Sequence, residues 1–172
     1  MNELVSKISS YHLFNYLLPG CLFAVLATTI SHRQFVEQNV VLGLFLYYFY
    51  GLIVSRFGSL LLQPFLKLVR FLRFAPYADF VAASKKDPKI DELSEINNMY
   101  RTLCALFLVL LLLKCTVMLE VQFPRLTPWE RPSIAIVIFG LLLFSYRTQT
   151  AYIRARVKAN TETTAGSISA EM

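Results

Sequence analysis

The sequence predicts an all-α, polytopic membrane protein with four transmembrane helices, of which the third and fourth extend into the cytoplasm. Three observations lead to this fold class. Hydrophobic residues make up 56% of the 172 residues, charged residues only 16%, and the mean hydropathy is +0.52. The apolar residues gather in four long runs, and most lysines and arginines lie on one side of those runs. Because a soluble domain is about one quarter charged, lipid is the better solvent for this chain.

The four apolar runs have the length of membrane spans. They lie at about 12–31, 39–63, 102–120 and 132–148. A helix needs about 17 to 25 residues to cross the hydrocarbon core of a bilayer. Backbone polar groups in lipid must find partners within the segment, and the alternating pattern of barrel strands is absent, so each run is expected to be a helix. The chain then divides into a first hairpin, a basic segment, a second hairpin and an extension with a polar tail, at 1–63, 64–101, 102–148 and 149–172.

Basic residues predict the orientation. The two short connections on one side carry Arg33, Arg125 and Arg131. The other side carries Lys7, Lys67, Arg70, Arg73, Lys85, Lys86, Lys89, Arg101, Arg147, Arg154, Arg156 and Lys158. Cytoplasmic loops of membrane proteins are enriched in lysine and arginine. Both termini and the segment 64–101 are therefore expected in the cytoplasm.

Helix signals extend the third span beyond the bilayer. Asp87 and Pro88 fit the N-cap and the first position of a helix. From Ile90 to Phe107, apolar residues recur every three or four positions without a breaker, so one helix is expected from about Pro88 to Glu120. This helix is expected to begin in the cytosol and then enter the membrane.

The last span is also expected to continue past the bilayer. Pro132 suits the first turn of a helix, and Trp129 before it fits an interfacial anchor. The helical pattern ends near Asn160, before the polar tail. Both cytoplasmic extensions carry apolar stripes that need a partner, either each other or the same helices of neighbouring copies.

Small residues recur at four-residue spacing on the first two spans. Gly20 and Ala24 lie on the first, and Gly51, Ser55 and Ser59 lie on the second. Such faces let helix backbones approach closely in lipid. They predict helix packing, either within one subunit or between subunits of an oligomer.

Several polar residues lie inside the spans. Asn15 lies one turn before Pro19, whose missing N–H leaves a carbonyl unpaired, which fits a packed kink or a hinge at a gate. Lys114 and Arg56 are ionisable residues that either reach towards an interface or face a shared axis. The tyrosines of the second span, Tyr47 and Tyr50 among them, fit aromatic packing or the polar lining of such a path.

The segment after Pro64 predicts an amphipathic basic helix at the membrane surface. Lys67, Arg70 and Arg73 form one stripe of that helix, which suits anionic lipid headgroups. An alternative is a basic cytoplasmic chamber in an oligomer, which would attract a phosphate-rich ligand such as a nucleotide or a short nucleic acid. The further residues of this chamber are Lys85, Lys86, Lys89, Arg154 and Arg156.

The sequence predicts neither an enzyme nor a cofactor-binding protein. It contains two histidines and three cysteines, with no metal-ligand spacing, phosphate-binding loop or nucleophile motif. Cys21, Cys104 and Cys115 all fall inside apolar runs, where they are expected to act as small apolar side chains.

Two flanking segments carry a resemblance to a group of known proteins. They are Tyr-His-Leu-Phe-Asn-Tyr-Leu-Leu-Pro-Gly at 11–20 and Tyr-Arg-Thr-Gln-Thr-Ala-Tyr-Ile-Arg-Ala-Arg-Val at 146–157. With the four-span layout, they resemble the small membrane subunits of two-gene bacterial anti-phage systems such as Kiwa and Hailong. The resemblance implies a multi-pass protein of the bacterial inner membrane, and either a homo-oligomer that works with a cytosolic partner or an ion channel controlled by a nucleotide-derived signal. It carries no functional residue over to this chain.

Two functions follow as hypotheses. The first is a homo-oligomeric channel-like effector of bacterial defence, with a tetramer as the working stoichiometry, gated through its basic cytoplasmic face. The second is a membrane sensor or anchor that docks and controls a cytosolic protein encoded in the same operon. A transporter is the third, less favoured reading, because no inverted repeat is evident.

Overall fold

The computed structural model describes residues 13–124 and 127–170 of the chain, and every regular element in them is a helix. The expected all-α class is therefore confirmed. Two short π-helices, η1 and η2, interrupt six α-helices. The elements are η1 (Leu13–Leu17), α2 (Leu18–Ser31), α3 (Val40–Phe57), η2 (Gly58–Leu62), α4 (Gln63–Leu68), α5 (Tyr77–Lys86), α6 (Lys89–Gln122) and α7 (Thr127–Ala170). The expected start of the first span, near residue 12, lies outside the described residues.

Three helical stretches are long and apolar enough to cross a membrane. They are Val40–Leu68, Lys89–Gln122 and Pro132–Lys158, with 29, 34 and 27 residues. The fourth apolar stretch, Asn15–Ser31, is shorter than these within the described residues. Length and composition thus give three candidate spans, as in a multi-pass membrane protein.

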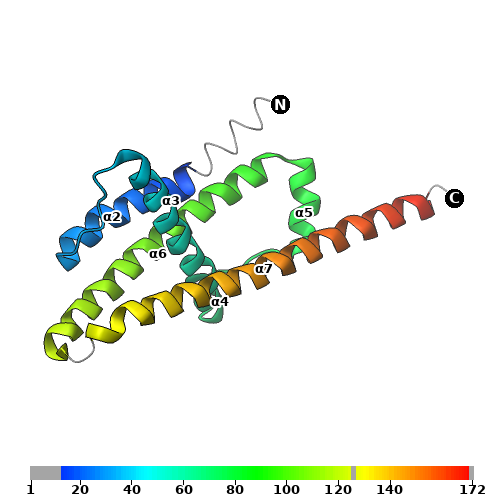
Figure 1. The fold of residues 1–172 in the computed structure, drawn as a ribbon. Coiled ribbons are helices and arrows are strands. Elements are labelled where there is room, and N and C mark those ends of the chain that lie inside the picture. The colour runs from blue at the N-terminus through cyan, green and yellow to red at the C-terminus, as the bar shows by residue number, and fades with distance from the viewer. Residues whose placement is uncertain (1–12, 125–126, 171–172) are drawn as a thin grey trace.

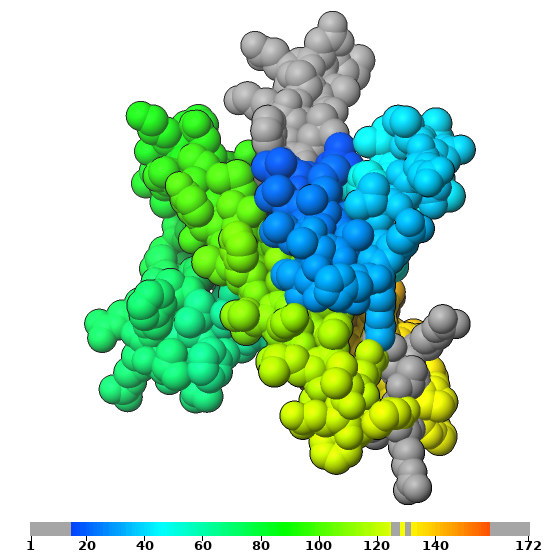
Figure 2. All heavy atoms as spheres, turned by 90° about the vertical axis from the view of Figure 1, so that its left-hand side faces the viewer, coloured from blue at the N-terminus to red at the C-terminus, as the bar shows by residue number. Residues whose placement is uncertain are grey.

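Helices α2, α3 and α6 form the packed part of the molecule. Figure 2 shows α2, in blue, lying against α6, in green and yellow-green, and against the early part of α3, in lighter blue. Ala27, Ala105 and Leu106 are fully buried between these helices. The small alanine side chains let the helix axes approach closely. The buried apolar core lies mainly among α2, α3 and α6.

Helix α7 diverges from this packed part. In Figure 1, α6 and α7 start from one short connection and spread apart, and α5 bridges the opening between them. Helix α7 contacts α3 and η2, and α5 contacts both α6 and α7. The rings of Tyr77 on α5 and Tyr152 on α7 lie 6.3 Å apart.

Each π-helix lies just before a proline. η1 ends two residues before Pro19, and η2 ends two residues before Pro64. A proline lacks the N–H for the helical hydrogen bond, and its ring clashes with the carbonyl four residues earlier. The wider π turn relieves this clash and lets each helix continue. The second span, expected to end near residue 63, therefore continues as helix through Pro64 to Leu68.

The expected basic stripe after Pro64 is also wrong as a helix face. Helix α4 ends at Leu68, and Arg70 has a positive φ of 59°. The Phe71 amide donates to the Leu66 carbonyl at 2.9 Å and the Arg70 amide to the Lys67 carbonyl at 3.0 Å, which is a Schellman ending. Arg73 lies beyond the helix end, so Lys67, Arg70 and Arg73 do not share one helical face.

The long third helix is confirmed as one continuous element. α6 runs from Lys89 to Gln122 without a break. The carboxylate of Asp87 accepts a hydrogen bond from the Lys89 amide at 3.0 Å, although Pro88 rather than Asp87 is the N-cap residue. That the first turns of α6 lie in the cytoplasm stays a prediction.

The expected ends of the last helix are both wrong. α7 begins at Thr127, so Pro132 lies inside the helix instead of in its first turn. Pro128, the second residue of α7, occupies the position that proline favours. At the other end α7 continues beyond Asn160 to Ala170, and this stretch contains no proline that would break the helix.

Candidate functional site

A buried polar cluster joins three helical elements of the packed part. Asn15 of η1, Ser55 of α3 and Thr102 of α6 are 3%, 4% and 0% exposed. The Thr102 hydroxyl lies 3.4 Å from Asn15 Oδ1 and 3.2 Å from Ser55 Oγ. It also donates within its own helix to the Asn98 carbonyl, at 2.9 Å. The cluster places the predicted polar residue Asn15 in the interior, against two other helices.

Hydrogen-bond counting explains why these three side chains depend on one another. The Thr102 hydroxyl carries one proton but has three oxygen neighbours, so it can donate to only one of them at a time, and the Ser55 hydroxyl can donate to it in turn. Buried polar groups that lose a partner pay a desolvation penalty of about 1 to 3 kcal/mol. The cluster therefore fixes how η1, α3 and α6 are aligned.

Two glycines let the first helical segment and α3 cross at close range. A Cβ atom on Gly20 would lie 1.7 Å from the Tyr47 carbonyl oxygen, and one on Gly51 would lie 1.8 Å from the Tyr16 carbonyl oxygen. Both contacts are with backbone, so neither can be relieved by turning a side chain. Gly20, Ala24, Gly51 and Ser55 are buried at this crossing, whereas Ser59 is only partly buried. These residues lie in contacts within one subunit.

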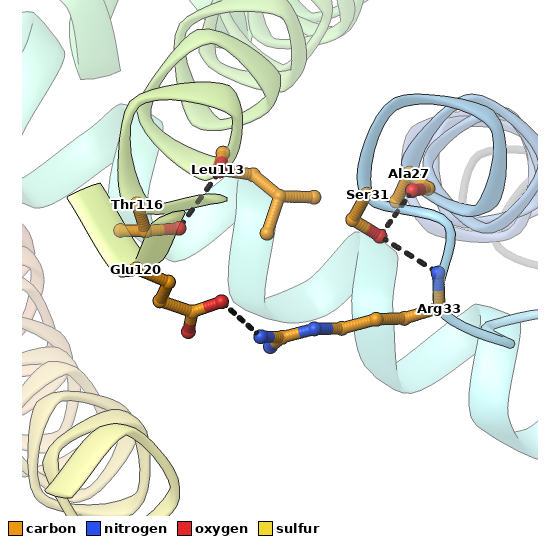
Figure 3. A network of polar contacts seen from close by, with 6 residues as sticks. All are labelled: Ala27, Ser31, Arg33, Leu113, Thr116 and Glu120. Atoms are coloured by element: carbon orange, nitrogen blue, oxygen red, sulfur yellow. Dashed lines mark hydrogen bonds and ion pairs between the residues drawn. The ribbon is translucent and has the colours of Figure 1, made fainter. Parts of the chain in front are cut away.

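An ion pair links the connection after α2 to the end of α6 (Figure 3). Arg33 Nη2 lies 2.6 Å from Glu120 Oε2, and the two side chains are 37% and 19% exposed. The Arg33 amide also donates to Ser31 Oγ, at 3.3 Å. This pair was not predicted from the sequence. The signal that could have pointed to it is the acidic Glu120 at the end of the long apolar run 102–120.

The two predicted tyrosines lie in separate environments. The Tyr47 hydroxyl accepts a hydrogen bond from the Glu37 amide at 3.1 Å and so anchors the connection between α2 and α3. The Tyr50 ring lies edge-on to Phe23 and Phe35, with centroid distances of 5.5 and 6.2 Å. Within one subunit, both tyrosines pack against neighbouring segments.

The two ionisable residues of the spans also lie apart. Lys114 is exposed on the surface of α6, and Arg56 is partly buried near the end of α3. With Asn15 inside the polar cluster, the five residues predicted to line a path are not gathered in one subunit. A shared path would have to be built by several copies.

The predicted basic residues are all exposed. They are Lys67, Arg70, Arg73, Lys85, Lys86, Lys89, Arg154 and Arg156. Lys67 lies over the ring of Phe74, with Nζ 4.4 Å from the centroid. On α7, a shallow hollow brings Arg154 together with two further basic residues that were predicted only to set orientation. The hollow is lined by Arg147, Thr150, Ala151, Arg154, Ala155 and Lys158.

Neither a cluster of metal ligands among the described residues nor a comparison with known proteins identifies a functional site. Within residues 13–124 and 127–170, no three histidine, cysteine, aspartate or glutamate side chains gather as metal ligands do. Comparison of the chain with family models, with curated proteins and with solved structures gives no match in any of the three. The resemblance to two-gene defence systems stays a hypothesis.

Proposed function

We propose that this chain is one subunit of a homo-oligomeric inner-membrane protein that forms a gated path for ions and acts in bacterial anti-phage defence. The observation that carries the oligomer is the exposure of α7. Of the 18 most apolar consecutive residues of this span, only 11% are buried within the subunit, against 22% in each of the other two candidate spans. A helix that makes so few contacts with its own chain is available to neighbouring copies and to lipid.

Four spans complete this proposal. Asn15–Ser31 is shorter than the other apolar helices, but it packs along α3 and α6 for its whole length and would cross the bilayer beside them. With four crossings, both termini and the segment 64–101 lie on the same side. The distribution of lysine and arginine supports the cytoplasm as that side.

The basic residues on this side support control from the cytoplasm. All eight predicted contacts are exposed, and they lie on α4, on α5, at the start of α6, on the outer part of α7 and in the connection after α4. An oligomer would repeat them around its axis and concentrate positive potential there. A phosphate-rich ligand or a cytosolic protein encoded nearby would be the controlling partner.

Reconstitution tests the channel directly. The purified protein in liposomes is expected to release a trapped ion-sensitive dye when a candidate trigger is added, with protein-free liposomes as the control. Oligomers of defined size that pass no ions under any trigger would exclude conduction while leaving the assembly intact. A monomer in bilayers would exclude the proposal as a whole.

A membrane sensor or anchor is the second candidate. It is favoured by the exposed apolar residues on the outer part of α7, since Tyr152 and Ile153 are 51% and 58% exposed. A soluble partner that docks there would do the damage itself. Recovery of one defined cytosolic protein with the tagged chain from its native host, together with silent liposomes, would favour this function over the channel.

A further inference from the structure

Exposed apolar residues form a stripe along the part of α7 that follows the proposed last span, from Tyr146 to Val157, which is its outer part. Tyr146, Ile153 and Val157 are 76%, 58% and 62% exposed, and Thr150 lies between the first two. Their spacing of four, three and four residues is the spacing with which one helix packs along another. This surface, the α7 stripe, begins where the proposed last span ends and continues away from the membrane.

A matching stripe lies on the first turns of α6. Leu93, Ile96 and Tyr100 are 61%, 39% and 60% exposed, and their three- and four-residue spacing puts them on one face. This surface, the α6 stripe, ends where the proposed third span begins. In the four-span arrangement, both stripes therefore lie at the same level, just outside the cytoplasmic side of the bilayer.

The charges beside the two stripes are opposite. Arg147 and Arg154 flank the α7 stripe on one side and Arg156 flanks it on the other, at the helical angle of about 100° per residue. Glu92 flanks the α6 stripe, Glu95 lies farther round the helix beyond Glu92, and Lys89 continues the line of the stripe one turn before Leu93. The three arginines and two glutamates are exposed, and the one salt bridge found within the described part of the chain involves none of them.

The shape of α7 also favours an acidic partner. The small side chains of Ala151 and Ala155 leave a shallow hollow beside the α7 stripe, and Arg147 and Arg154 line it. A glutamate that enters this hollow would lie between two guanidinium groups. Pairs of this kind are charge-assisted, and they gain strength as the surrounding apolar residues exclude water.

One subunit cannot bring its own two stripes together. Helix α5 lies between the start of α6 and the outer part of α7, and it contacts both (Figure 1). Val81 of α5 is 7% exposed, and the Tyr77 ring of α5 lies 6.3 Å from the Tyr152 ring of α7. Two copies of the α7 stripe cannot pair with each other favourably either, because arginines would then face arginines.

We propose that the α6 stripe of one subunit packs against the α7 stripe of a second copy of this chain. Each subunit then contributes one surface to each of two neighbours, which is a head-to-tail contact, and such contacts close into a ring when the rotation between subunits allows it. The inference rests on the oligomer in the proposed function, and it deepens that function by naming the interface. Glu92 and Arg154 are the central charge pair.

Charge reversal tests this interface. Glu92→Arg and Arg154→Glu are each expected to lower the oligomer population at least about tenfold in native mass spectrometry, and the double variant is expected to restore it. Asp91→Arg makes the same change on the opposite side of α6, where the residue is exposed, and is expected to leave the oligomer unchanged. Loss in the Asp91 variant, or no rescue in the double variant, would overturn the proposal.

Mixing the two single variants tests the head-to-tail arrangement. A Glu92→Arg copy keeps its α7 stripe, and an Arg154→Glu copy keeps its α6 stripe. Tagged copies of one are therefore expected to retain the other as a pair, although neither forms large oligomers alone. Mixed copies that fail to pair would overturn the proposal, and the double variant separates it from a contact between like stripes, where reversing both charges would again place like charges opposite each other.

A disulfide trap locates the contact. In a background without Cys21, Cys104 and Cys115, oxidation of the Ile96→Cys, Ile153→Cys variant is expected to give a ladder of crosslinked copies. The matched control replaces Ala155, which lies across α7 from Ile153, so Ile96→Cys with Ala155→Cys is expected to give no ladder. A stable oligomer without crosslinks would refute this interface alone, whereas a crosslinked oligomer without ion flux would refute the channel alone.

Discussion

Helix α2 and helix α7 are both apolar, yet one is packed within the subunit and the other stands apart. Pro19, Gly20, Ala24, Ala27 and Ser31 of α2 are buried against its neighbours. Among the described side chains of α7, Ser145 alone is buried. The difference follows the size of the residues, since α2 buries a face of small side chains, whereas the apolar residues of α7 between Ile134 and Phe144 are mostly large.

This comparison shows that hydropathy places a helix in lipid but does not decide what it packs against. Lipid tails are as apolar as leucine, so helices in a bilayer associate through close backbone approach and through polar contacts. The packed part has both, in the Gly20 and Gly51 crossing and in the Asn15, Ser55 and Thr102 cluster. In the proposed interface, the exposed residues of α7 pack against a neighbouring copy.

The largest expected effect comes from filling the helix crossing. Gly51→Ala is expected to destabilise the subunit by about 3 kcal/mol, because the new methyl group meets the Tyr16 backbone at 1.8 Å. Gly140→Ala is the matched control on α7, where an added Cβ has nothing within 4 Å. It is expected to be stabilising by about 0.5 to 1 kcal/mol, because alanine favours helix.

Unfolding in mixed micelles, followed by circular dichroism, measures both glycine variants. The comparison between the two regions would break down if they behaved alike. Equal destabilisation would mean that α7 is as tightly packed as α2. Equal tolerance would mean that α2 and α3 do not cross at these glycines.

The second effect comes from the polar cluster. Thr102→Val keeps the shape of the side chain but removes the hydroxyl that Asn15 and Ser55 contact, so it is expected to destabilise the subunit by about 1 to 2 kcal/mol. Thr116→Val is the control on the same helix, since Thr116 is exposed and its hydroxyl donates only to the Leu113 carbonyl at 2.7 Å. Its effect is expected to stay within about 0.5 kcal/mol. If both variants lost the same free energy of unfolding, the buried cluster would contribute no more than an exposed hydroxyl group.

The third effect concerns the Arg33 and Glu120 ion pair. A double-mutant cycle with Arg33→Gln and Glu120→Gln is expected to give a coupling of about 0.5 to 1 kcal/mol, since both side chains are only partly buried. The coupling is expected to shrink in 1 M salt, where exposed charges are screened within about 3 Å. A coupling that salt leaves unchanged would place the pair deeper than its exposure indicates.

The sequence predicted the features that follow from composition and periodicity. The all-helical fold, the membrane-like helices and the continuous α6 all depend on long apolar runs, which are visible in one sequence. It did not predict which residues meet across the chain. The Arg33 and Glu120 pair joins positions 87 residues apart, and nothing local connects them.

Helix ends were predicted less well, because the expected signals were absent or misleading. The second span is expected to end before Pro64 and the last to begin at Pro132, yet a π turn lets the helix pass Pro64, and Pro128 takes the starting position of α7. Two helices also end without glycine. His32 and Arg70 adopt the left-handed conformation that glycine usually supplies, with φ values of 56° and 59°.

The smallest expected effect tests the end of α4, where the chain leaves the packed part of the molecule towards α5. Arg70→Gly is expected to be stabilising by about 0.5 kcal/mol, since relief of about 1 to 2 kcal/mol at a left-handed position is partly offset by the greater backbone entropy of glycine when unfolded. Lys67→Gly, inside α4, is expected to be destabilising by about 1 kcal/mol in the same unfolding measurement. If both glycines destabilised equally, α4 would not end at Leu68, and the path of the chain from α4 to α5 and α7 would have to be redrawn.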